Sequence, residues 1–129
     1  MVVEPRYLLD TNICIYILDA ARPALRARLE AAEIGSLVTS TIVLAEVVRG
    51  IAHDDRRTLA KLQALLQLAT VQPFDERAAL AYAQLPFARG RFDRLIAAHA
   101  LSLGLVIVTA NPRDFTDIAD LRVEDWTQA

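Results

Sequence analysis

The stretch Leu105-Val106-Ile107-Val108-Thr109 decides the fold class, because it is the clearest strand in the sequence. A continuous apolar run of this length is typical of a strand that is buried on both faces of a parallel sheet. An apolar helical pattern precedes it over residues 93–103, and Gly104 ends that helix. A polar loop over residues 110–114 follows the strand. The succession of helix, strand and loop predicts an α/β fold.

The same alternation continues outward to both ends of the chain. Further strands are predicted at residues 7–9, 36–39, 71–74 and 121–123, and further helices begin near residues 11–13, 23, 42, 54–55 and 75. The strand at 71–74 is predicted to lie at an edge, because Pro73 cannot donate to a central ladder. We therefore expect a single α/β domain over residues 1–129, with a central, mainly parallel sheet of about four to five strands flanked by helices.

Length and composition exclude several classes of protein. A chain of 129 residues is expected to form one domain, and 54% hydrophobic with 23% charged residues indicates a globular protein. A formal net charge of −2 excludes binding of polyanions by bulk charge. The single cysteine, Cys14, excludes a disulfide scaffold and a cysteine zinc site, and two histidines are too few for a histidine metal cage. No stretch approaches the roughly 20 apolar residues that span a bilayer, so we expect a cytoplasmic protein without membrane association.

Polar side chains follow three of the predicted strands. Asp10 ends the first strand, Ser40 ends the second, and Asn111 and Asp114 come after the strongest one. Ligands of parallel sheets bind outside the carboxyl ends of the strands, so these side chains are expected at one edge of the sheet. Each also has a structural interpretation, because Asp10 could cap a helix and Asn111 and Asp114 could be turn residues around Pro112.

Glu46 is the least expected residue in the chain, because it is one carboxylate in an otherwise apolar helix turn. Burial of an unpaired carboxylate costs several kcal/mol, so Glu46 should face a cation, a donor or a cleft, unless it reaches solvent or pairs with Arg49. Asp93 opens the helix before the strongest strand and could cap it, as Asp75 is expected to cap its own helix. Crowded carboxylates repel one another unless a cation neutralises them, and oxygen ligands without thiolate favour Mg²⁺ or Mn²⁺. Such sites usually act on phosphate esters.

Four motifs occur in order along the chain: Leu9-Asp10-Thr11-Asn12, Ser40-Thr41-Ile42 with Ala45-Glu46, Asp93-Arg94-Leu95-Ile96-Ala97-Ala98-His99-Ala100, and Val108-Thr109-Ala110-Asn111-Pro112-Arg113-Asp114-Phe115. The tail is Leu121-Arg122-Val123-Glu124-Asp125-Trp126. Together they resemble the PIN-domain ribonucleases, and specifically the VapC toxins of bacterial toxin–antitoxin pairs. Each motif is weak alone, but the ordered set is specific and covers nearly the whole chain.

The resemblance implies an acidic metal-binding core of Asp10, Glu46 and Asp93. Its fourth position falls on Asn111, where many PIN domains have Asp, and Asp114 is the neighbouring carboxylate with a catalytic role.

The resemblance also assigns supporting residues, a reaction and partners. Thr11 and Ser40 match polar positions that orient the acids, and Asn12 steadies the first turn. In the family a metal-activated water attacks an RNA phosphodiester. The implied partners are an RNA substrate, a cognate VapB-type antitoxin that blocks the cleft, and a second copy of the chain in a homodimer.

Arginines beside the acids are candidates for contact with RNA phosphates. They are Arg91, Arg94 and Arg113, with Arg91 the best placed, and Arg89 lies close to them in sequence. A solvated face or structural ion pairs are the alternative for each of them. The segment over residues 87–92 is shorter than in many VapC-like chains, which we expect to alter the rim that admits RNA.

Other functions remain open from the residues alone. A phosphatase or phosphoacceptor domain with Asp10 as nucleophile would need a lysine after a later strand, but the only lysine, Lys61, falls within an amphipathic helix. A non-catalytic RNA- or protein-binding module would not need Glu46 in an apolar turn and would usually expose aromatic side chains. A PIN-like nuclease that processes RNA without being a toxin is a further alternative. His99 and Cys14 are predicted to pack in the interior.

Overall fold

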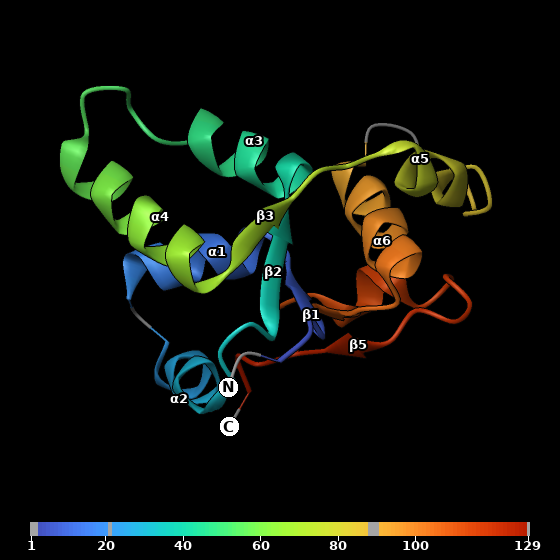
Figure 1. Cartoon of the computed structure of the whole chain (residues 1–129), viewed down its shortest axis with the longest axis horizontal. Coiled ribbons are helices and arrows are strands. Elements are labelled where there is room, and N and C mark those ends of the chain that lie inside the picture. Colours follow the sequence, from blue (N-terminus) through green and yellow to red (C-terminus); the bar gives the residue numbers. More distant parts are fainter. Residues whose placement is uncertain (1–2, 21, 88–90, 129) are drawn as a thin grey trace.

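Strand β1 (Tyr7–Leu9) lies at the centre of a sheet in which every pairing is parallel (Figure 1). The computed structural model describes residues 3–20, 22–87 and 91–128. The strand order in this part of the chain is β3-β2-β1-β4-β5. The other strands are β2 (Leu37–Ser40), β3 (Thr70–Gln72), β4 (Val106–Val108) and β5 (Val123–Glu124). The predicted α/β class and parallel sheet are confirmed, and β3 is the edge strand that Pro73 indicated.

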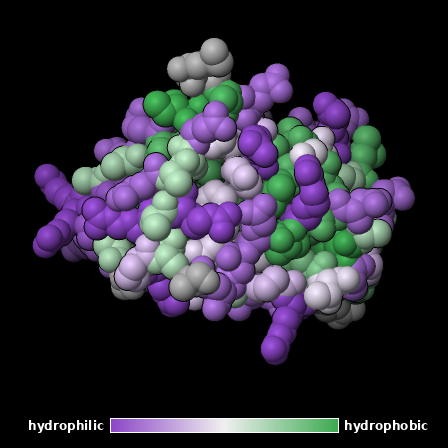
Figure 2. All heavy atoms as spheres, turned by 90° about the horizontal axis from the view of Figure 1, so that it is seen from below, coloured by the Kyte–Doolittle hydropathy of each residue, from purple (hydrophilic) through white to green (hydrophobic). Residues whose placement is uncertain are grey.

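The helices connect these strands and fall into two groups. They are α1 (Thr11–Asp19), α2 (Pro23–Ala31), α3 (Thr41–Arg49), α4 (Arg56–Leu68), α5 (Glu76–Tyr82), α6 (Phe92–Leu103) and the 3₁₀ helix η1 (Pro112–Phe115). Helix α1 packs against α3 and α4, whereas α5 packs against α6. Figure 1 shows α4 and α2 toward one end of the molecule and α5 with α6 toward the other. Figure 2 shows a mostly hydrophilic face from below, with a hydrophobic patch toward the end that holds α5 and α6.

Short polar side chains start most of these helices. Asp10, Ser40, Asp55 and Asp75 each accept a hydrogen bond from a backbone N–H of the first helical turn. Gly104 ends α6 with a left-handed φ of 69°, which a residue without a side chain adopts at little cost. The helix boundaries are therefore set by local chemistry that the sequence displays.

The central strands are buried on both sides, as the apolar run at residues 105–109 predicted. Leu8 and Leu9 of β1 and Ile107 and Val108 of β4 are all 0% exposed. Burial also raises the pKa of the Cys14 thiol to about 12, which fits its predicted place in the interior. The strand bounds differ by one or two residues from those expected at 36–39, 71–74, 105–109 and 121–123, because these strands span Leu37–Ser40, Thr70–Gln72, Val106–Val108 and Val123–Glu124. No helix in the described ranges is both long and apolar enough to cross a membrane.

Candidate active site

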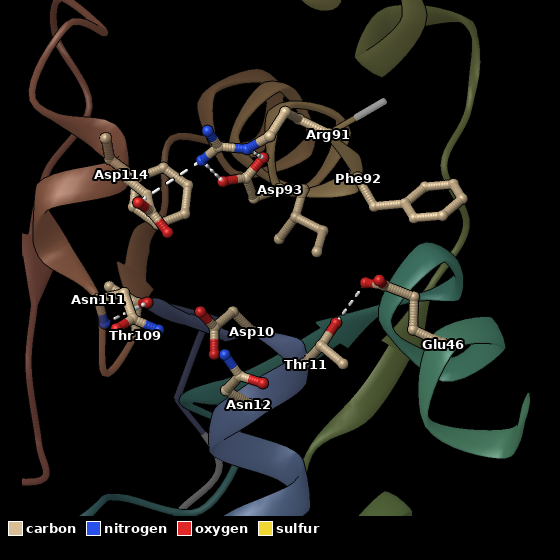
Figure 3. A pocket seen from close by; sticks show the side chains of 12 residues that line it. Asp10, Thr11, Asn12, Glu46, Arg91, Phe92, Asp93, Thr109, Asn111 and Asp114 are labelled. Atoms are coloured by element: carbon tan, nitrogen blue, oxygen red, sulfur yellow. Dashed lines mark hydrogen bonds and ion pairs between the residues drawn. The ribbon is translucent and has the colours of Figure 1, made fainter. Parts of the chain in front are cut away.

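A cavity of about 290 Å³ opens where β1 and β4 end (Figure 3). It is lined by Asp10, Thr11, Asn12, Glu46, Arg91, Phe92, Asp93, Ile96, Thr109, Asn111, Asp114 and Phe115. The parallel register explains why these groups meet, because Leu9 pairs with Val108 and the residues after both strands emerge side by side. All four predicted acids and Asn111 therefore face one cavity, although they come from four separate parts of the chain.

Asp10 is both a helix cap and a buried acid of the cavity. Its Oδ1 accepts a hydrogen bond from the Ile13 N–H at 3.0 Å, and the residue is only 7% exposed. The pKa of Asp10 is raised from 3.8 to about 6, mainly by burial and to a smaller extent by the charges of Glu46 and Asp93. Hydrogen bonds from the Thr109 side chain and the Ile13 N–H act in the opposite direction. Asp10 therefore caps α1 and also lines the cavity at the end of the strands.

Glu46 reaches the cavity from α3. Val43 and Val47 bury one face of this helix, and the half-buried Glu46 projects beside that face. Its Oε1 accepts a hydrogen bond of 2.5 Å from the Thr11 hydroxyl. Thr11 therefore contacts one of the predicted acids. The partner of Glu46 is this hydroxyl donor rather than Arg49, which was the alternative.

Asp93 lies in the first turn of α6 but does not cap it. The N-cap residue is Arg91, and no side chain caps this helix by a hydrogen bond. Instead, the Arg91 Nε donates to Asp93 Oδ1 at 3.0 Å, and the Arg91 Nη2 donates to Asp93 Oδ2. The same Nη2 lies 3.6 Å from Asp114 Oδ1. The hydrogen bonds with Asp93 raise the pKa of Arg91. Arg91 therefore bridges two of the predicted acids (Figure 3).

Thr109 is a site residue that was not among the predicted ones. It is fully buried, lines the cavity, hydrogen bonds to Asp10, and accepts a hydrogen bond from the Asn111 N–H at 3.0 Å. The sequence did carry a signal, because Thr109 is the first polar residue after the apolar run of β4. A parallel register that places Asp10 after β1 places Thr109 beside it.

Ser40 does not have the role that was expected. Its Oγ accepts a hydrogen bond from the Ile42 N–H at 3.0 Å and lies 2.8 Å from His99 Nδ1, and Ser40 is not part of the cavity wall. His99 is 1% exposed, and burial lowers its pKa. The prediction that Ser40 orients the acids is therefore corrected to a contact with a buried histidine, and His99 packs in the interior as expected.

The candidate arginines occupy different environments. Arg94 is 6% exposed, and its Nη1 lies 2.9 Å from Asp117 Oδ1, so burial removes it from the candidates for RNA contact. This contact is an ion pair without hydrogen-bond geometry, and Nε and Nη1 have no hydrogen-bond partner within the described residues. Arg113 is exposed on η1 and lies outside the cavity wall. Arg91 is also exposed, but it forms part of the cavity wall. Arg89 lies outside the described residues, as do the other residues of 88–90 in the shortened segment.

The donor set suits a hard divalent cation, although the side chains do not yet surround one. The cavity offers carboxylate, amide and hydroxyl oxygens, and a cation would offset the charge that burial disfavours at Asp10. Within the described ranges, however, no three Asp, Glu, His or Cys side chains are close enough to hold one ion. Asp93 is instead paired with Arg91, and Glu46 with Thr11. The donor chemistry therefore fits, and ligation requires rotation of these side chains.

Lys61 contributes nothing to this cavity. It lies on α4, and its Nζ is 3.5 Å from the Leu18 carbonyl oxygen. A phosphatase with Asp10 as nucleophile would need a lysine at the site, so this position weighs against that alternative.

Comparisons with known proteins agree with the order of the motifs. The PIN domain model matches residues 7–121. A tRNA(fMet)-specific endonuclease VapC of Shigella flexneri is 34% identical over 131 residues, which cover 95% of this chain and 98% of that protein. Ribonuclease VapC2 of Rickettsia felis is 30% identical over 130 residues, covering 93% of this chain and 97% of that protein.

Solved structures share the fold over nearly the same length. The crystal structure of VapBC2 from Rickettsia felis bound to a promoter DNA fragment contains a chain that matches with a TM-score of 0.83 and 29% identity, covering 93% of this chain and 98% of that one. A chain of VapBC-1 from Haemophilus influenzae matches with a TM-score of 0.80 and 30% identity, covering 95% and 98%. Sequence, fold and site thus lead to one assignment: the chain belongs to the PIN domain family and, within it, to the VapC ribonucleases.

Proposed function

We propose that the protein is a Mg²⁺- or Mn²⁺-dependent endoribonuclease that acts as the toxin of a toxin–antitoxin pair. The observation that carries this proposal is the buried Asp10 at the carboxyl end of β1, which shares a cavity with Glu46 and Asp93. A buried carboxylate whose pKa is raised to about 6 by burial is costly for the fold, and a bound cation would offset that cost. Membership of the VapC ribonucleases supports the same reaction.

The chain's own groups would divide the work. Asp10, Glu46 and Asp93 would hold the cation, with the oxygen of Asn111 as a fourth ligand and Asp114 as the neighbouring catalytic carboxylate. When bound, such a cation polarises a phosphodiester and activates water for hydrolysis.

Neighbouring side chains keep these acids in place. Thr11 holds the carboxylate of Glu46, and Thr109 holds that of Asp10. Asn12, exposed at the start of α1, would steady the first turn at the cavity wall. Arg91 and the exposed Arg113 would contact RNA phosphates.

The proposed partners come from the relatives. The solved neighbours are VapBC complexes, so we propose a VapB-type antitoxin that covers the cavity. A homodimer and a cytoplasmic location are proposed on the same ground.

Cleavage of RNA by the purified protein tests the reaction. We expect cleavage with Mg²⁺ or Mn²⁺, none with EDTA, and none by the Asp10→Asn and Asp93→Asn variants. Asp75→Asn is the matched control, because Asp75 also starts a helix but lies outside the cavity wall. Undiminished cleavage by Asp10→Asn and Asp93→Asn would refute the assigned site.

Expression in bacteria tests the biological role. We expect growth arrest by the wild-type chain alone, relief by co-expression of the antitoxin, and no arrest by Asp93→Asn. Normal growth with an active, soluble enzyme would instead favour a PIN nuclease that processes RNA without being a toxin.

A further inference from the structure

Arg91 is paired with the carboxylate of Asp93, which a bound cation would need as a ligand. Its Nε and Nη2 donate separately to the two oxygens of Asp93, and Nη2 also lies 3.6 Å from Asp114 Oδ1. The planar guanidinium matches a carboxylate in this two-point manner. Asp93 therefore has no oxygen that is free of Arg91, although it lies in the cavity with Asp10 and Glu46.

The acids line one cavity but do not form a ligand set. No three potential ligands among the described residues are close enough to hold one ion. Asp93 is one of these potential ligands, and it is hydrogen bonded to Arg91. A guanidinium and a divalent cation both neutralise carboxylates, so the two compete for Asp93. The side chain of Arg91 is 41% exposed, so it can turn toward solvent without disturbing the core.

We propose that a divalent cation displaces Arg91 from Asp93, and that the released guanidinium then binds an RNA phosphate at the rim of the cavity. This inference rests on the proposed function, because it assumes that Asp93 is a cation ligand. The step is an exchange of partners: Arg91 gives up one anion and takes another of similar shape. Arg91 would thereby make the affinity for RNA depend on whether the cation site is occupied.

The chemistry of the two partners makes this exchange reasonable. Arginine binds carboxylate and phosphate with the same pair of parallel N–H donors, so one side chain can serve both. Arg91 directly precedes α6, whose first turn carries Asp93. The Arg91 side chain lies at the wall of the same cavity (Figure 3).

The neighbouring arginines supply the controls. Arg113 is exposed beside Asp114 in sequence, and within the described residues it makes no ion pair closer than 4.0 Å. Arg113→Ala therefore removes one positive charge near the site without freeing Asp93. Arg91→Lys keeps the charge but loses the two-point contact.

Calorimetric titration of Mn²⁺ into the full chain without RNA tests the displacement. We expect Arg91→Ala to bind Mn²⁺ about threefold to tenfold more tightly than the wild type, Arg91→Lys to lie between them, and Arg113→Ala to match the wild type. Equal affinities for the wild type and Arg91→Ala, or the same gain in Arg113→Ala, would overturn the displacement. If no variant binds Mn²⁺ at any concentration, the proposed function fails together with this inference.

Cleavage kinetics at saturating Mn²⁺ test the second half of the exchange. We expect Arg91→Ala to raise KM for a short RNA about threefold to tenfold while kcat changes less, and the dependence of KM on salt to become shallower by about one phosphate contact. An unchanged KM with an unchanged salt dependence would overturn the phosphate contact. Tighter Mn²⁺ binding combined with weaker RNA binding supports the exchange as a whole.

Discussion

Asp10 and Asp55 make the same local contact in two different regions of the molecule. Each precedes a helix, and each accepts a hydrogen bond of 3.0 Å from the backbone N–H three residues later. Asp10 follows the central strand and is 7% exposed, whereas Asp55 starts α4 at the surface. Burial raises the pKa of Asp10 to about 6, while hydrogen bonds from Thr58 lower the pKa of Asp55.

The comparison separates what a helix cap does from what a buried acid does. Both carboxylates satisfy a backbone N–H that the helix would otherwise leave unpaired. Only Asp10 does so among other acids and away from water, where its charge works against folding. The fold therefore tolerates at Asp10 a charge that burial disfavours.

The largest expected difference between these two residues is in cation binding. Asp10→Asn keeps an acceptor for the Ile13 N–H but removes the charge, so we expect Mn²⁺ affinity to fall by at least about tenfold. Asp55→Asn should leave Mn²⁺ affinity unchanged. Calorimetric titration measures both, and equal losses would show that the distinction between the two regions is wrong.

The next largest difference is in stability without metal. A folded-state pKa raised from 3.8 to about 6 means that the stabilising effect of protonated Asp10 is complete below pH 3.8 and is lost as the pH rises through 6. About two pKa units correspond to about 3 kcal/mol, so Asp10→Asn should be more stable than the wild type by up to about 3 kcal/mol at pH 7.5. Urea unfolding in EDTA at pH 4 and pH 7.5 measures this. A gain that does not shrink toward pH 4 would contradict it.

Loss of a cap alone should have a smaller effect. Asp75 accepts from the Ala78 N–H at 3.0 Å on an exposed helix start, so Asp75→Ala should lower the free energy of unfolding by about 1 kcal/mol. Asp75→Asn should restore most of this, because asparagine is also a good cap. Thermal unfolding of both variants would show whether capping or charge accounts for the change.

The smallest expected effect is the pH dependence of Asp55, and it has the opposite sign to that of Asp10. Its pKa is lowered in the folded state, so its contribution to stability is present above the ordinary pKa of 3.8 and is lost as the pH falls through the lower folded value. Asp55→Asn should therefore be slightly less stable than the wild type at pH 7, with the difference disappearing in acid. Unfolding midpoints across this range measure the trend, and a difference that does not change with pH would show that the contact with Thr58 is unimportant.

Features that depend on neighbouring residues in the chain were predictable from the sequence. The predicted strand at residues 7–9 coincides with β1, and Pro73 correctly marked an edge strand. The gathering of Asp10, Asn111 and Asp114 at one edge followed from the parallel sheet once the strand ends were assigned, whereas the resemblance to PIN-domain ribonucleases implied that Glu46 and Asp93 join them.

Features that depend on distant partners were not. Arg94 follows Asp93 directly, and only its contact with Asp117 in the folded chain explains its burial. Ser40 meets His99 across 59 positions of sequence, so no local pattern could have identified that contact. The bridge from Arg91 to Asp93 is local, but its hold on both carboxylate oxygens depends on side-chain orientation, which the sequence does not display.

The position of β1 between β2 and β4 also governs when the site can form during synthesis. Tyr7 pairs with Leu37 of the next strand along the chain, whereas its other neighbour, Val106, is synthesised much later than β1 and β2. A half-made chain holds Asp10 and Glu46 but lacks Asp93, Thr109 and Asn111. The cavity therefore cannot assemble before β4 and the residues that follow it have been synthesised.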